Sequence, residues 1–259
     1  MRNEKMDYLN ALGKMTVIYC SYVGQLMLLF LECLRRLNQV NLKEMLRQMY
    51  KLGVQSLPIV TLTILFTGMV LAVQTAKEFV RFGAAASVGG VVAIAMAREL
   101  VPVLTGVVVA GRVGAAIAAE IGSMKVTEQI DALRVMAVNP VRYLVVPRVW
   151  ACLLMLPILV IYGNILGSVG GYFVATSYAK ISGYTYLNSI KVFMEFYDLF
   201  GGMIKSMFFG VIIALVGCFR GMNAQQGAEG VGVATTASVV LSIILIFIFN
   251  YFLSVLLYV

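Results

Sequence analysis

The sequence predicts an all-α integral membrane protein with an N-terminal interfacial helix, five transmembrane helices and a cytoplasmic coupling helix between spans two and three. Three observations set the class. The 259 residues are 61% hydrophobic and only 12% charged, whereas soluble domains are about half apolar and about a quarter charged. The mean hydropathy is +0.93. The apolar residues also gather in five segments, each about as long as the 20 residues that a span requires.

The five expected spans differ in regularity. The second is interrupted by Arg98, Glu99 and Pro102, and the third is long enough to be tilted in the bilayer. The fifth carries no charge. We see no internal repeat of the kind that builds many secondary transporters, and we expect one domain over residues 1–259. The spans cover residues 56–76, 88–119, 145–178, 201–219 and 231–259.

Residues 1–51 are expected to form cytoplasmic and interfacial helices ahead of the bundle of residues 52–259. Residues 15–31 are uncharged, but they are at the lower limit of length for a span, and Glu32, Arg35 and Arg36 follow at once. We expect this segment to lie in the membrane interface, with a true span as the alternative. Residues 38–51 form a basic amphipathic stretch.

The Lys and Arg residues predict the orientation. The formal net charge is +8. Residues 1–51 hold eight Lys and Arg, the loop between spans two and three holds four, and Arg220 follows span four on the same side, against four in the opposite loops. The positive-inside rule therefore predicts a cytoplasmic N-terminus and a periplasmic C-terminus.

Several kinds of chemistry are excluded or disfavoured. The chain has no His, which excludes His-based triads and zinc sites of the HExxH type. No GxxxxGK[ST] phosphate-binding motif occurs, so a partner must bind any ATP that drives the protein, and we expect no cofactor and no metal in this chain. The four cysteines are scattered through apolar surroundings and are interpreted as small buried hydrophobes.

Residues 110–140 have an unusual pattern. A run of Gly and Ala that includes Arg112 and Glu120 changes at Gly122 into a mixed segment, which ends at Asn139-Pro140. We predict a tightly packed span that leaves the bilayer and becomes a short amphipathic helix, which suits docking to a soluble partner. An ordinary surface helix is the alternative. The residues expected to carry the coupling are Lys125, Glu128, Ile130, Asp131, Leu133 and Arg134.

The same region resembles the MlaE permease family, the membrane subunits of ABC-type lipid transporters that work with MCE-domain proteins. The resemblance is carried by GMVLAVQ (residues 68–74), AREL (97–100), AGRVGAAIAAEIGSMKVTEQIDAL (110–133) and MAVNP (136–140). It implies a permease subunit in the inner membrane of a Gram-negative bacterium. It also implies a homodimer with a cytoplasmic ABC ATPase, a periplasmic MCE-domain partner and a phospholipid substrate.

Charged residues inside spans are costly and usually face a cavity or a partner. For Arg98 and Glu99 a structural ion pair between spans is the alternative to a cavity role. The resemblance places AREL at the lipid cavity, where Arg98 would suit a phosphate head group. Lys205 either lines the cavity or extends to the outer interface. Leu71, Phe79 and Phe82 match a region that lines the family's cavity, but on the sequence alone they are ordinary lipid-facing or core residues.

Three glycines recur at four-residue spacing in span three, at Gly163, Gly167 and Gly171. Small residues at that spacing let membrane helices approach closely, so we assign them to helix packing. The chain also departs from the family at Ala237, where relatives often carry an arginine. A non-transporting scaffold that anchors a soluble partner is the main functional alternative, and an intramembrane enzyme or a channel lacks a supporting motif.

Overall fold

The computed structural model describes residues 2–258, and within them it describes the side-chain surroundings of all but residues 2–16, 18, 19 and 38. The described chain contains helices and no strand, which confirms the all-α prediction. Five helical stretches are long and apolar enough to cross a membrane. They are Leu42–Arg81, Ala85–Val126, Val141–Ser177, Phe196–Met222 and Gly227–Tyr258.

These stretches are built from several shorter elements. The first joins α2 (Leu42–Leu52), η2 (Val54–Ser56) and α3 (Leu57–Arg81). The second joins η3 (Ala85–Ser87), α4 (Val88–Ala95), η4 (Met96–Leu100), α5 (Val101–Val109), η5 (Ala110–Gly114) and α6 (Ala115–Val126). The third joins η6 (Val141–Val145) and α8 (Val146–Ser177), and the last two are α10 (Phe196–Met222) and α11 (Gly227–Tyr258). Of these elements η4, η5 and η6 are π-helical turns.

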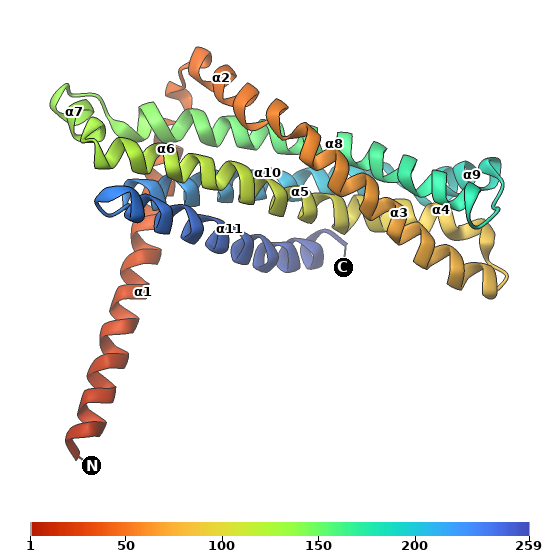
Figure 1. Cartoon of the computed structure of the whole chain (residues 1–259), viewed down its shortest axis with the longest axis horizontal. Helices are drawn as coiled ribbons and strands as arrows, with labels where there is room; N and C mark the ends of the chain where they lie inside the picture. Colours follow the sequence, from red (N-terminus) through yellow and green to blue (C-terminus); the bar gives the residue numbers. More distant parts are fainter. Residues whose placement is uncertain (1, 259) are drawn as a thin grey trace.

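The spans lie along one common axis, and a short helix lies at each end of the bundle (Figure 1). α7 (Gln129–Val135) lies at one end, between α6 and η6, and α9 (Gly183–Phe193) lies at the other. α9 was not predicted from the sequence. Ser182 caps its first turn by accepting a hydrogen bond from the backbone N–H of Thr185 at 3.3 Å.

α1 (Arg2–Arg36) runs across the direction of the spans and meets the bundle near its α7 end, where η1 (Leu37–Gln39) follows it (Figure 1). This direction agrees with an interfacial helix and not with a sixth span. Its C-terminal half is fixed to the bundle. Cys33 is buried there, and the indole N–H of Trp150 donates to the carbonyl of Leu37 at 3.1 Å.

The glycines of α8 pack within the chain, against α3 and the second span. Gly68 of α3 lies on the backbone of Gly167, so closely that an added Cβ would meet the Gly167 Cα at 2.8 Å. An added Cβ at Gly163 would meet Val101, and one at Gly171 would meet Val92 at 3.3 Å. These positions therefore accommodate direct contact between helices, as the four-residue spacing predicts.

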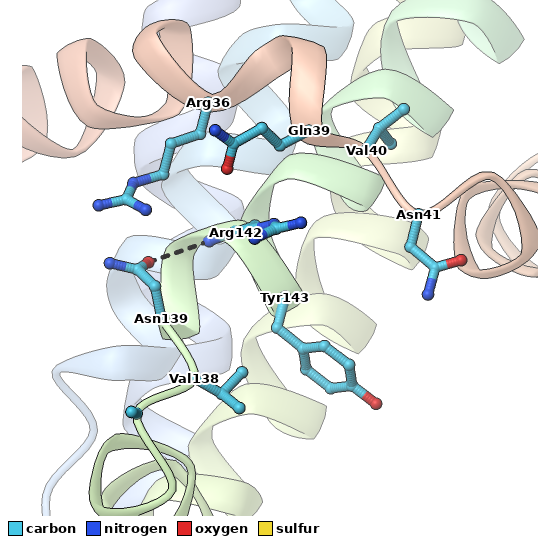
Figure 2. Close-up of a pocket in the computed structure, with 9 residues that line it drawn as sticks. Arg36, Gln39, Val40, Asn41, Val138, Asn139, Arg142 and Tyr143 are labelled. Carbon is cyan, nitrogen blue, oxygen red and sulfur yellow. Dashed lines mark hydrogen bonds between the residues drawn. The ribbon is translucent and has the colours of Figure 1, made fainter.

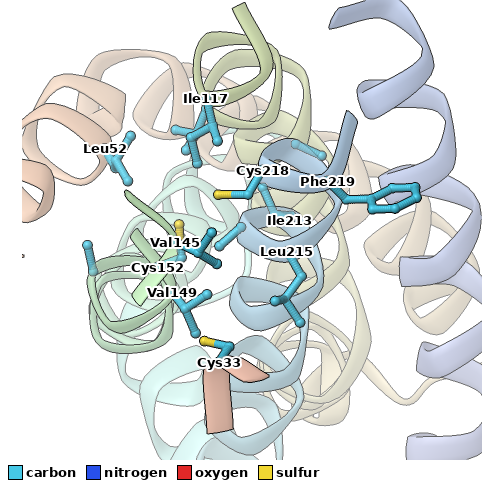
Figure 3. Close-up of a cluster of buried hydrophobic side chains, with 14 of the residues drawn as sticks. Cys33, Leu52, Ile117, Val145, Val149, Cys152, Ile213, Leu215, Cys218 and Phe219 are labelled. Atoms are coloured by element: carbon cyan, nitrogen blue, oxygen red, sulfur yellow. The ribbon is translucent and has the colours of Figure 1, made fainter. Parts of the chain in front are cut away.

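A hydrophobic cluster at the α7 end joins α8, α10, α6 and the end of α1 (Figure 3). Cys33, Cys152 and Cys218 are buried in it, which confirms their interpretation as small core residues, whereas Cys20 is exposed. A second cluster occupies the α9 half, between α3, α4, α8 and α9, with Tyr186 of α9 fully buried. The two clusters fix both ends of the bundle.

Candidate functional site

The second span changes its hydrogen-bonding pattern where its charges lie. In η4 the backbone N–H of Val101 donates to the carbonyl of Met96, five residues earlier. Pro102 comes next and has no N–H to donate to the carbonyl of Arg98, four residues before it. A carbonyl without its backbone partner is costly inside a membrane, so another donor is required there.

Lys205 of α10 supplies that donor. Its Nζ atom donates to the Arg98 carbonyl at 2.9 Å, to Glu99 Oε1 at 2.7 Å and to Ser254 Oγ at 2.8 Å. An ammonium group has three N–H bonds, and these three contacts use all of them. The side chain is 0% exposed. Lys205 therefore neither extends to the interface nor presents a donor to a cavity; it holds Glu99 and the freed carbonyl in place.

The close approach of α10 to η4 depends on a glycine. An added Cβ at Gly202, one turn before Lys205, would collide with the carbonyl oxygen of Ala97 and would meet Pro102 Cγ at 3.2 Å. Because Gly202 has no side chain, α10 lies directly against the π turn. This contact brings Lys205 within hydrogen-bonding distance of η4.

Arg98 pairs with a different residue of α10. Its Nε atom donates to Asp198 Oδ1 at 2.6 Å, and the Asp198 side chain is 1% exposed. The second oxygen of Asp198 accepts from the backbone N–H of Glu195 at 3.0 Å, which caps the start of α10. Arg98 and Glu99 thus form two separate ion pairs. Asp198 was not predicted as a site residue because it lies outside the expected span.

The terminal guanidinium nitrogens of Arg98 remain available. Among the described residues, neither Nη1 nor Nη2 has a hydrogen-bond partner, and the side chain is 37% exposed. Its carbon Cζ lies 4.9 Å from the ring centre of Tyr258, a distance suited to a cation–π contact. Arg98 is therefore held by Asp198 and Tyr258 while keeping donors for a further anion.

α11 completes what we call the intramembrane cluster. Asn250 Nδ2 donates to Glu99 Oε2 at 2.9 Å, and Ser254 Oγ lies 2.8 Å from Glu99 Oε1. From the sequence this span was expected only to be uncharged, although an Asn in such an apolar segment is itself a signal of a polar contact. The cluster consists of Arg98, Glu99, Asp198, Lys205, Asn250, Ser254 and Tyr258.

A mainly apolar groove of about 410 Å³ lies on α3 and η4, and Leu100 is its lining residue from the same turn as Arg98 and Glu99. Leu71 and Leu100 both line it, so Leu71 lies close to the residue immediately after Glu99. Phe79 and Phe82 do not line this groove. Phe79 packs against the hydrophobic cluster between α3, α4, α8 and α9, and Phe82 is 79% exposed just beyond α3. A role for these two residues in a lipid cavity stays a prediction.

A second polar network joins three elements near the α7 end. Glu120 Oε2 of α6 accepts from Lys51 Nζ at 3.1 Å and pairs with Arg148 Nη2 at 3.2 Å. Arg112 donates to Ser56 Oγ at 2.7 Å and to Gln55 Oε1 at 3.1 Å. These contacts fix the second span to its neighbours, with Arg112 bound to η2 and Glu120 bound to α2 and α8.

Within the mixed segment between Gly122 and Asn139-Pro140, the separate helix α7 covers only Gln129–Val135. Residues 124–126 still belong to α6. The helix is then interrupted at Glu128, whose backbone has a left-handed φ of 58°. Lys125 Nζ donates to Asp131 Oδ2 at 2.9 Å across this break, and Arg134 Nη1 donates to Asp131 Oδ1 at 3.2 Å. The hydrogen bond from Lys125 holds the pKa of Asp131 below its usual range. These charges therefore brace the turn.

The apolar face of α7 points towards its own bundle. Ile130 is buried in the core at this end, and Leu133 packs partly buried against it. Two other apolar residues, Val135 and Met136, are 87% and 64% exposed at the end of α7. They were not predicted as contacts. Since Ile130 and Leu133 fix the segment, Val135 and Met136 are its most exposed large apolar side chains and the ones best placed to meet a partner.

Residues 45–256 match the family model described as Permease MlaE. The chain belongs to the MlaE permease family. It is 46% identical to a probable ABC transporter permease protein of Synechocystis sp., over 84% of this chain and 82% of the relative. A probable ABC transporter permease protein of Rickettsia typhi is 42% identical over 98% of both chains.

A plant protein is similar as well. The protein TRIGALACTOSYLDIACYLGLYCEROL 1, chloroplastic, of Arabidopsis thaliana is 39% identical over 89% of this chain and 65% of its own length. The family membership identifies this chain as a multi-pass ABC transporter permease, and such components are generally not catalytic themselves. The intramembrane cluster and α7 are therefore the two candidate regions for contacts with a substrate and with a partner.

Proposed function

We propose that this chain is the permease subunit of a transporter that moves phospholipid between the inner membrane and a periplasmic MCE-domain protein. It acts as a homodimer with a cytoplasmic ABC ATPase that binds the ATP. The Lys and Arg distribution supports a cytoplasmic α7 end and N-terminus, and a periplasmic C-terminus. ATP-driven movement of the ATPase is transmitted through α7 and α6 to the lipid cavity.

The observation that carries this proposal is the state of Arg98. An arginine in a span is costly unless it has a function or a partner. Here one nitrogen is held by Asp198, the terminal nitrogens lack partners among the described residues, and Leu100 of the same π turn lines an apolar groove with Leu71. A phosphate group on Arg98 with acyl chains along Leu71 and Leu100 fits both features.

Arg98→Lys should separate lipid binding from folding. Lysine keeps a positive charge for Asp198 but lacks the second and third nitrogens of the guanidinium group. We expect normal amounts of protein in the membrane with the ATPase bound, and a roughly tenfold fall in phospholipid transfer between proteoliposomes and the MCE-domain partner. Arg81→Lys, at the end of α3, is the matched control.

Unchanged transfer by Arg98→Lys would contradict a head-group role for Arg98. If transfer is undetectable even for the native complex while the ATPase remains bound, the chain acts as a non-transporting scaffold. Loss of transfer in Arg81→Lys to the same extent would also contradict the assignment, because that side chain lies outside the cluster.

A second test concerns the exposed end of α7. Val135→Asp together with Met136→Asp should release most of the ATPase from the detergent-purified complex, since acidic groups replace the two apolar side chains that a partner can reach. Gln129→Asp, at the exposed start of the same helix, should leave the ATPase bound. Stoichiometric ATPase in the double variant would show that docking occurs elsewhere.

A further inference from the structure

A cationic groove lies at the α7 end, far from the intramembrane cluster. Its main part has a volume of about 570 Å³ and separates the end of α1 and η1 from the start of η6 (Figure 2). Arg36 and Gln39 come from one side, and Arg142 and Tyr143 from the other. A second part of about 500 Å³ shares Arg36 and Gln39 and continues along α1. We call the two parts together the α1 groove.

The groove carries more positive than negative charge. Arg35, Arg36 and Arg142 line it, and Glu32 is its one acidic lining residue in the described part of the chain. Glu32 already accepts from Asn139 Nδ2 at 3.1 Å and pairs with Arg36 Nε at 3.3 Å. Arg35 and Arg142 form no salt bridge with any residue that the structure describes. Two arginines are thus left for an external anion.

The part of the groove along α1 adds an apolar surface. Leu28 is 67% exposed and lies three residues before Leu31, which is also exposed, and seven before Arg35. This spacing places the three residues along one face of the helix. Because α1 crosses the span direction, the groove has apolar side chains next to cations at the level of a membrane surface.

The walls of the groove are fixed in advance. Asn139 Oδ1 accepts from the backbone N–H groups of Val141 and Arg142 at 2.9 and 3.1 Å, which positions the start of η6. The same side chain holds Glu32 of α1. A ligand therefore does not have to order this region, and a preformed site binds with less loss of entropy.

We propose that the α1 groove binds the head group of an anionic phospholipid, separately from the transport cavity. The phosphate lies where the two parts of the groove meet, with Arg35 lining one part and Arg142 the other, and an acyl chain lies along Leu28 and Leu31. An acidic soluble protein would match the cations but would leave these exposed leucines without a partner. The combination of two arginines that form no salt bridge among the described residues with adjacent leucines is what selects a lipid.

The test uses the purified full-length chain with its partners in mild detergent. Binding of phosphatidylglycerol and of phosphatidylcholine is titrated by native mass spectrometry for the native sequence, for Arg35→Gln with Arg142→Gln, and for the control Arg47→Gln. Arg47 is a highly exposed cation of α2 outside the groove. We expect phosphatidylglycerol to bind at least about tenfold more weakly to the double variant, and the control to bind it normally.

Equal phosphatidylglycerol affinity in the double variant and the native chain would overturn the proposal, as would equal weakening in the control. Phosphatidylcholine that binds as tightly as phosphatidylglycerol would contradict an anion-selective site. Displacement of the lipid by inorganic phosphate at the same concentration would show a simple anion site. If the double variant yields no folded protein, Arg142→Gln alone is used. Lipid transfer is measured in parallel, so that a failure of the transport proposal is seen separately.

Discussion

Glu99→Gln is expected to remove most of the folded protein from the membrane. Lys205 is fully buried, and its ammonium group would lose its only carboxylate partner among the described residues. Removal of one member of a fully buried ion pair costs about 3–5 kcal/mol. Because the Glu99 side chain is 40% exposed, we expect a cost near the lower end of this range, which is still a large part of a total stability of roughly 5–15 kcal/mol. The measurement is the amount of monodisperse protein after detergent extraction, determined by fluorescence size-exclusion chromatography.

Glu99→Gln with Lys205→Met should recover much of that protein, because no charge is then left without a partner. The matched comparison is Arg98→Ala with Glu99→Ala. If Arg98 and Glu99 paired with each other, this second double variant would also recover protein. The structure pairs them with Asp198 and Lys205 instead. The second double variant should therefore leave Asp198 and Lys205 without their partners and give the lowest yield. Recovery by Arg98→Ala with Glu99→Ala and not by the first double variant would contradict these assignments.

Gly68→Leu is expected to have the second large effect. The Cα of Gly68 faces the backbone of Gly167, which cannot move aside as a flexible side chain can. Overpacking costs about 1–3 kcal/mol and more where backbone is displaced, so the temperature of unfolding should fall by roughly 5–10 °C. A thermal unfolding curve of the purified protein measures this change.

Gly111→Leu is the control for this substitution. Gly111 also lies in a spanning helix, but no heavy atom lies within 4 Å of the position that its Cβ would take. We expect this variant to unfold within about 2 °C of the native protein. If both leucines lower the unfolding temperature equally, the loss comes from leucine in these helices and not from the contact between α3 and α8.

The sequence predicts the spans well because their length and apolar content follow directly from the bilayer. It predicts side-chain partners poorly. Asp198 lies about a hundred residues from Arg98 and just outside the expected fourth span, so the sequence gives no direct signal that the two residues meet. The local signal was the spacing of Glu195 and Asp198, which form a capping box at the start of α10.

The coupling segment shows a similar limit. Its periodic charges indicate a helix, but they do not show which face the rest of the protein covers. Ile130 looked like a docking residue and is instead part of the core, whereas Val135 and Met136 lie at the exposed end. The direction in which α7 leaves α6 decides this, and that direction depends on the left-handed turn at Glu128.

The π turns of the second span change which neighbouring helices its side chains face. In a regular α-helix, residues 14 apart lie about 40° from each other around the axis, so Arg98 and Arg112 would share a side. Each π turn takes in an additional residue and rotates the later part of the helix by about 100°. The two arginines accordingly contact different parts of the bundle, Asp198 of α10 and Ser56 of η2. A single membrane-spanning helix thus presents its two halves to different neighbours without an unwound loop in the apolar layer.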